Sequence, residues 1–234
     1  MTAIALALIP CVIVQFILNE RELQLKHQQM LAGMSIPGYW ISNILFDIIM
    51  AYIPIGLIIL LMFLFDKLYD GAWVLFLLYP PAVVPYTYVL SFLFTSDINA
   101  QINTLFLHFT AAGLGVAVVF TLQQIPQMMP WGDALRWVFT LVPSFCVTHG
   151  LLWSASYNLI RENRTEPTTT DNIPIPRQLP ADLWAWYNLE GDAVILVIHC
   201  VVGLFLLTLI EIEAIRLLDW MPRISLRFGS NEQR

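Results

Sequence analysis

The chain has 234 residues, of which 58% are hydrophobic and only 12% are charged, and its formal net charge is -6. Soluble domains contain about 45–50% apolar and about 25% charged residues, so this composition excludes an ordinary soluble protein and indicates an integral membrane protein. No run of five like charges marks a surface for nucleic acid, so we expect no nucleic-acid partner.

Membrane-spanning segments account for most of the chain. A helix needs about 20 apolar residues to cross the hydrocarbon layer. The segments that meet or approach this length are residues 3–18, 39–65, 72–94, 102–122 and 193–215. The first is short, but no basic segment precedes it and no A-x-A cleavage site follows it, which favours a span over a secretory signal. The sequence therefore predicts an all-α, polytopic membrane helix bundle with five transmembrane spans.

A charged segment at residues 20–32 separates the first two predicted spans. Glu22 and Lys26 are four residues apart, a spacing that stabilises a helix, and the glycines and proline of residues 33–38 end it. We predict a short cytoplasmic elbow helix here. An amphipathic linker that lies among lipid headgroups explains the same residues equally well.

Polar residues follow one face of the second predicted span. Tyr39, Asn43 and Asp47 recur every four residues, which places Asp47 about 12 Å along the helix from Tyr39. A carboxylate at the centre of a membrane helix costs about 2.5–3.5 kcal/mol on insertion scales, so Asp47 should face protein or water. Two interpretations stay open: a translocation or coupling position, and a buried carboxylate that bonds a neighbouring span.

A sixth apolar stretch, residues 131–153, is interrupted by charged residues and by Pro143. Pro143 divides it into two pieces of about ten residues, each too short to cross a membrane, which favours an external re-entrant helical hairpin. The connection that follows, residues 154–192, contains an N-x-[ST] sequon at Asn163. We expect this connection to be an external loop and Asn163 to be glycosylated.

Basic residues indicate the orientation of the chain. They flank the first span and follow the last one, where Lys and Arg set membrane topology: Arg21, Lys26, Arg216, Arg223 and Arg227. Both sites are therefore predicted to be cytoplasmic, which requires an odd number of crossings from an external N-terminus. Five spans and a hairpin that does not cross satisfy this condition and leave residues 218–234 as a cytoplasmic tail.

The segment from residue 20 to residue 47 also contains a recognisable pattern. Its characteristic positions are Glu20, Arg21, Lys26, His27, Gln29, Gly33, Tyr39, Trp40, Ser42, Asn43 and Asp47. The pattern resembles a signature of the A subfamily of ATP-binding-cassette transporters, the lipid exporters. Further matching positions are Tyr79, Pro85, Tyr88, Ser91 and Phe92 in the third span and Pro143, Phe145, Cys146, Gly150 and Leu151 in the hairpin.

The order and spacing of these segments are similar to the last five spans of one transmembrane domain, usually the second half of a full transporter. The chain departs from the family pattern at several positions. Pro80 and Pro81 replace Gly-Trp, Val89 replaces a proline, and His149 stands where an arginine is common.

The resemblance implies a role for each part. Within the elbow, the residues that would form a coupling helix against an ATPase are Glu20, Arg21, Lys26, His27 and Gln29. The implied partners are a membrane lipid substrate, a nucleotide-binding domain and the other transmembrane half. ATP and Mg²⁺ would bind that domain, because no Gly here is followed by Lys and a G-x-x-x-x-G-K-[ST] loop cannot be present. We expect a fragment or truncated product with no enzymatic activity of its own.

Two other classes of function compete with this one. A secondary transporter or channel could use Asp47 as an ion or proton site, although no internal repeat is visible. An intramembrane enzyme could use His108 or His199, but the chain has no H-E-x-x-H motif and no recognisable Ser, His and Asp spacing. We expect these histidines to form interhelical hydrogen bonds, and we predict no catalytic residue and no metal site.

Overall fold

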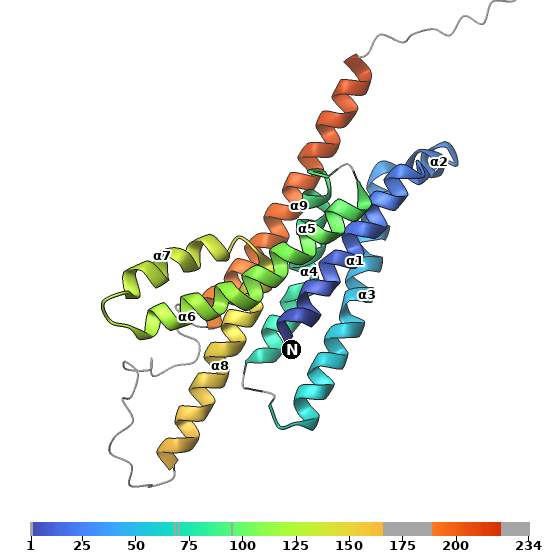
Figure 1. Ribbon diagram of the computed structural model, residues 1–234. Helices are drawn as coiled ribbons and strands as arrows, with labels where there is room; N and C mark the ends of the chain where they lie inside the picture. Colours follow the sequence, from blue (N-terminus) through green and yellow to red (C-terminus); the bar gives the residue numbers. More distant parts are fainter. Residues whose placement is uncertain (1, 68, 70, 95, 166–188, 221–234) are drawn as a thin grey trace, which may run out of the picture.

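The computed structural model describes residues 2–67, 69, 71–94, 96–165 and 189–220, with side chains described as far as residue 158 and again from 189 to 212. Every regular element in these ranges is a helix (Figure 1). The elements are α1 Thr2–Glu22, α2 Leu25–Leu31, α3 Ile36–Leu64, α4 Ala72–Ser91, α5 Asp97–Phe109, the π-helix η1 Thr110–Gly115, α6 Val116–Gln124, α7 Met129–Phe139, α8 Pro143–Thr165 and α9 Leu189–Trp220. The predicted all-α fold is confirmed for this part of the chain.

Five helical segments of the described chain are long and apolar enough to cross a membrane: Thr2–Glu22, Ile36–Leu64, Ala72–Ser91, Asp97–Gln124 and Leu189–Ile212. They agree in order with the five predicted spans. The fourth segment joins α5, η1 and α6, so a π-helical turn replaces the uniform α-helix that its apolar sequence predicts. The chain is therefore a multi-pass membrane protein.

Helix α4 lies at the centre of the bundle and packs against α1, α3, α8 and α9. Its side chains Phe76, Tyr79 and Tyr88 are fully buried. Contact with α9 is close because Gly203 has no side chain: a Cβ there would lie 3.1 Å from Pro85 Cβ and from the backbone nitrogen of Tyr86. Small residues allow such close approach between membrane helices, where apolar burial alone does not drive association.

The sequence predicts one elbow helix at residues 20–32, but the structure divides this segment between two helices. Helix α1 continues through Glu22, and the shorter α2 begins only at Leu25. Gln24 between them has a left-handed backbone with φ 55°, which breaks the helix, and Gly33 at φ 97° follows the end of α2. Glu20 and Arg21 therefore belong to the end of the first span. The reason is tertiary, since both side chains bond to neighbouring helices.

Helices α7 and α8 cover the segment predicted as a re-entrant hairpin, which is called the hairpin below, with wider limits than residues 131–153; α7 packs along α6. Pro143 is the first residue of α8, where its missing N–H costs no hydrogen bond, so it divides the two helices as predicted. Helix α8 then continues to Thr165, which corrects the external loop expected from residue 154. The middle of α8 packs on the bundle, where Leu151 and Ser154 are buried.

Two sequence predictions lie outside the described residues. The Asn163 side chain falls in the last turn of α8, where side chains are not described, so its glycosylation stays a prediction. Most of the predicted tail at 218–234 lies beyond residue 220.

Candidate functional site

The polar stripe of α3 faces the end of α1. The Tyr39 hydroxyl donates to Oε2 of the buried Glu20 at 2.9 Å, and the Asn43 amide donates to the same oxygen at 3.4 Å. Glu20 therefore bonds a neighbouring span, and its predicted role in coupling to an ATPase stays untested. These contacts fix the angle at which α3 returns beside α1.

Asp47 lies deeper in the same interface and bonds α4. The Tyr88 hydroxyl donates to Asp47 Oδ2 at 2.6 Å, and both residues are buried. A carboxylate that accepts a short hydrogen bond between two helices is the structural alternative of the sequence analysis. The geometry fits that alternative, and a translocation role for Asp47 stays untested.

Arg21 ties the end of α1 to the end of α4. Its Nη2 donates to the Ser91 hydroxyl at 3.1 Å and its Nη1 donates to the Ser91 carbonyl at 3.3 Å. The guanidinium also lies over the Phe92 ring, 4.5 Å from its centroid. The Ser91 hydroxyl in turn donates to the Tyr88 carbonyl, so the Arg21 contact adjoins the bond that Tyr88 makes to Asp47.

Lys26 connects α2 to α9. Its ammonium lies 2.7 Å from both carboxylate oxygens of Glu211, and the side chain of Lys26 is 33% exposed. The ammonium also lies 4.9 Å from the Trp40 ring centroid and 5.6 Å from that of Tyr39, within the range of cation–π attraction. This ion pair joins two segments that are far apart in the sequence, the elbow and the last span.

The outer face of α2 is left open by these contacts. His27 and Gln28 are exposed, Gln29 is partly buried, and Leu31 is 76% exposed. No residue of α2 is buried. Of the predicted coupling residues, Glu20, Arg21 and Lys26 therefore turn toward the membrane helices, while His27 is available to a partner.

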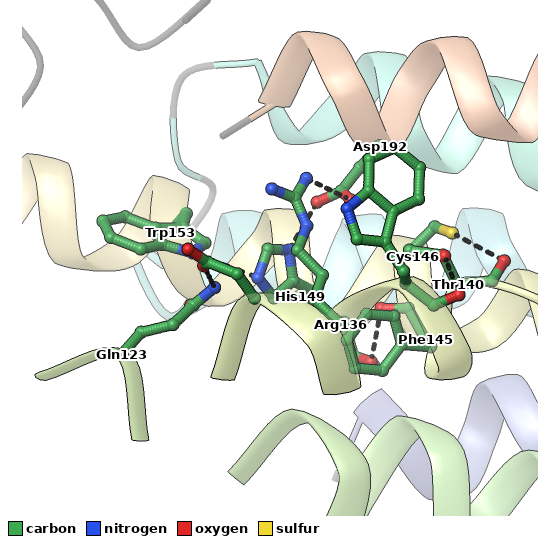
Figure 2. Close-up of polar contacts among 11 residues, drawn as sticks. Gln123, Arg136, Thr140, Phe145, Cys146, His149, Trp153 and Asp192 are labelled. Atoms are coloured by element: carbon green, nitrogen blue, oxygen red, sulfur yellow. Dashed lines mark hydrogen bonds and ion pairs between the residues drawn. The ribbon is translucent and has the colours of Figure 1, made fainter. Parts of the chain in front are cut away.

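A second group of charges joins the hairpin to α9 (Figure 2). Arg136 of α7 donates to Asp192 Oδ1 at 3.1 Å, and His149 Nδ1 lies 2.7 Å from Asp192 Oδ2. The Trp153 indole N–H donates to His149 Nε2 at 3.1 Å. Because an indole nitrogen only donates, we assign the imidazole proton to Nδ1, from which it is donated to Asp192. One carboxylate thus accepts bonds from both helices of the hairpin.

The predicted hairpin residues Phe145 and Gly150 support this group. The Phe145 ring stacks on the His149 ring at a centroid distance of 5.3 Å (Figure 2). At Gly150, a Cβ would lie 2.6 Å from Leu75 Cδ1 and 3.2 Å from Asp192 Oδ2. Gly150 is therefore required for the close contact of α8 with α4 and α9.

The intramembrane histidines bond between elements, as expected. Tyr79 donates to the Leu6 carbonyl at 2.7 Å, and the Ser144 hydroxyl lies 2.7 Å from Tyr79 Oη and 2.6 Å from His108 Nδ1. Each hydroxyl has one proton, so Ser144 donates to Tyr79 and His108 donates to Ser144. His199 Nε2 lies 3.1 Å from the Leu141 carbonyl in the turn of the hairpin. These contacts join α1, α4, α5, α8 and α9.

The two charged groups lie near opposite ends of the membrane span Leu189–Ile212 of α9. Asp192 is in its first turn, and Glu211 lies about 28 Å further along at about 1.5 Å per residue. This separation is close to the hydrocarbon thickness of about 30 Å. The last span therefore has one acid near each membrane face, one bonded to the hairpin and the other to the elbow.

Sequence reasoning missed several members of both groups. The sequence identified Tyr88 and Ser91 only as positions of the family pattern and did not predict their bonds to Asp47 and Arg21. Asp192 and Glu211 had a usable signal, because acids at both ends of a strongly apolar helix require partners. That Arg136 and Lys26 are those partners depends on the packing of distant segments.

Comparison with known proteins assigns the family. Residues 1–210 match the family described as ABC-2 family transporter protein. The chain is 24% identical over 196 residues to human ATP-binding cassette sub-family A member 13, covering 78% of this chain and 4% of that protein. It is 29% identical over 166 residues to the ABC transporter ced-7 of Caenorhabditis elegans, covering 68% of this chain and 10% of that protein.

Similarity extends to transporters with a named substrate. Over 138 residues, 55% of this chain, it is 29% identical to the rat phospholipid-transporting ATPase ABCA3, of which it covers 8%. The chain thus spans a tenth or less of the length of these relatives. Because the family match covers residues 1–210, and so four candidate spans and nearly all of the fifth, this chain belongs to the ABC-2 family of transporters, as a membrane component similar to the A subfamily.

Proposed function

We propose that this chain is the membrane part of an ATP-driven phospholipid exporter, and that the outer face of α2 receives an ATPase. The observation that supports this most strongly is the elbow itself. Helix α2 is exposed on one side, while Lys26 bonds Glu211 of α9 on the other. A partner that moves α2 would therefore displace the last span directly.

The substrate class comes from the relatives. Those with a named activity include phospholipid-transporting ATPases of rat and human. ATP and Mg²⁺ would be bound by the partner ATPase, and a second transmembrane half would complete the transporter. This chain would supply the spans and the elbow that couples them to ATP binding.

Site-specific photocrosslinking tests the elbow contact. With benzoylphenylalanine at Gln28, in cells that express the chain, we expect capture of a protein that contains a phosphate-loop ATPase domain, identified by mass spectrometry. The matched control is the same probe at Ile49, which is 62% exposed on the membrane-spanning part of α3 and should capture no such protein. Equal capture at both positions, or none at Gln28, would contradict the proposed contact.

Transport is the second test of the function. Proteoliposomes that contain the chain and the captured ATPase should move fluorescent phosphatidylcholine between leaflets with ATP and Mg²⁺. A non-hydrolysable ATP analogue should not support this movement. ATP-independent movement through the chain alone would favour a channel or secondary transporter instead.

We also propose that α2 is cytoplasmic and the hairpin external, with an external N-terminus. The opposite ends of α9 at which these two parts bind support this arrangement. In sealed vesicles, the C-terminus should resist external protease, and the chain should gain one glycan that Asn163→Gln removes. An externally cleaved C-terminus would reverse the orientation.

A further inference from the structure

A long groove lies on the outside of the bundle between α4, α9 and the turn of the hairpin. Its volume is about 560 Å³, and its wall along α9 extends from Ile195 to Ile210. At about 1.5 Å per residue, this wall is about 22 Å long. The groove opens outward, because Ile198 is 51% exposed and Leu141 is 68% exposed. Since α4 and α9 are candidate spans, this opening faces membrane lipid.

The lining of the groove favours an apolar ligand. Most of its wall is aliphatic or aromatic, and its polar members are few. Thr140 donates to the Trp137 carbonyl at 2.8 Å, and the ring nitrogens of His199 lie 2.8 and 3.1 Å from backbone carbonyls. A neutral imidazole donates from one nitrogen only, so one of these His199 contacts is a hydrogen bond. The other polar atoms of the lining are the Tyr86 hydroxyl and the Trp137 indole N–H, so an occupant is held mainly by apolar contact.

The dimensions distinguish between two apolar occupants. Volume divided by length gives a mean cross-section of about 25 Å². An α-helix with side chains is about 10 Å wide, so a second helix could rest on the open side of this groove but would not fill its depth. Carbon atoms in contact are about 3.5–4.0 Å apart, so a hydrocarbon chain about 4–5 Å wide has a section of about 15–20 Å² and fits.

We propose that this groove is a binding site for one acyl chain of a membrane phospholipid. The closed floor of the groove supports this. Gly203 lets α9 rest against Pro85 and Tyr86, so the two helices meet at the base and diverge toward the lipid. The bound lipid would be resident between α4 and α9. This inference goes beyond the proposed function, because it requires only that α4 and α9 cross the membrane.

Adjacent residues of α9 offer a matched test. Val202 lines the groove, whereas Val201 does not line it and is 61% exposed. The full chain, reconstituted in dioleoylphosphatidylcholine and extracted in mild detergent, is examined by native mass spectrometry. We expect one retained phosphatidylcholine on the wild type and on Val201→Trp. Retention should fall about fivefold in Val202→Trp, because the indole fills the groove and the acyl chain loses its packing contacts there. These contacts account for the binding, since moving an apolar chain from lipid into an apolar groove gains little by itself.

A second variant and two further outcomes complete the experiment. Ile198→Trp, which fills the same groove, should lose the lipid as Val202→Trp does, and both should keep the wild-type melting temperature. Equal retention in all four proteins would overturn the site. A lipid-free dimer in the wild type that Val202→Trp abolishes would also overturn it, because a helix of a second copy would then occupy the groove.

Discussion

The hairpin end and the elbow end of α9 are both fixed by charged side chains, but in different ways. At the hairpin, Asp192 and His149 are fully buried and the side chain of Arg136 is only 10% exposed. At the elbow, Lys26 is one-third exposed and α2 has no buried residue. One group of charges is closed off from solvent, and the other stays partly open.

This difference in exposure predicts a difference in rigidity. We call the buried group of Arg136, His149 and Asp192 the anchor, and the partly exposed pair of Lys26 and Glu211 the joint. Breaking a buried ion pair leaves an uncompensated charge in a low dielectric, which is strongly destabilising. A partly exposed pair can open with water as a substitute partner, at small cost. The left-handed residues Gln24 and Gly33 also limit α2 to a short helix. We therefore expect substitutions at the hairpin to impair folding and substitutions at the elbow to change motion.

The largest effect is expected at Asp192. Asp192→Asn removes the charge that faces Arg136 and should lower stability by about 3–5 kcal/mol, the usual cost of breaking a buried pair. Thermal unfolding in detergent, followed by fluorescence, measures the change. Glu190→Gln is the control, since Glu190 is exposed in the same helical turn. A similar melting temperature for both variants would remove the distinction between anchor and joint.

Gly150 tests the packing of the same anchor. Gly150→Ala places a methyl group 2.6 Å from Leu75 Cδ1 and should cost about 2 kcal/mol through overpacking. Gly56→Ala, on α3, meets no atom within 4 Å and should leave stability unchanged or raise it by up to about 1 kcal/mol. Both are compared by thermal unfolding. Equal stability of the two variants would show that α8 can shift away from α4.

Tyr88 tests the deepest bond at the elbow end. Tyr88→Phe leaves Asp47 without its donor and should cost about 1.5 kcal/mol, as for a buried acceptor that loses its partner. Tyr52→Phe, whose hydroxyl donates to the uncharged Leu77 carbonyl within the membrane span, should cost less, because no carboxyl group loses its donor. If Asp47→Leu in the Tyr88→Phe background restores stability but abolishes transport, Asp47 has a functional role besides its structural one.

The smallest effect on stability is expected at Lys26. Lys26→Met should cost only about 0.5–1 kcal/mol, because the pair with Glu211 is partly exposed. It should nevertheless broaden the distance distribution between spin labels at Gln28 and Leu209, measured by electron paramagnetic resonance. The control His27→Met changes an exposed residue of the same helix and should leave the distribution narrow. A narrow distribution in Lys26→Met would mean that α2 is held by other contacts.

Elements with a strong local signal were predictable from the sequence. The spans follow from apolar length, and the division of the hairpin follows from Pro143, which cannot continue a helix that precedes it. The elbow was predicted less well, because Glu20 and Arg21 are as polar as the residues that follow them. Their membership of α1 depends on bonds to Tyr39 and Ser91. The length of α8 was missed because residues 154–165 are mostly polar and have no apolar periodicity that predicts a helix.

By itself the sequence determined the class, the spans and the family, because apolar length and helix-breaking residues act locally along the chain. Only the tertiary structure decided which charges meet. Arg136 and Asp192 are 56 positions apart, and Lys26 and Glu211 are 185 positions apart. A buried or half-buried charge requires a partner, but local sequence does not specify which one. That choice is made when the helices pack, and it is what distinguishes the hairpin anchor from the elbow joint.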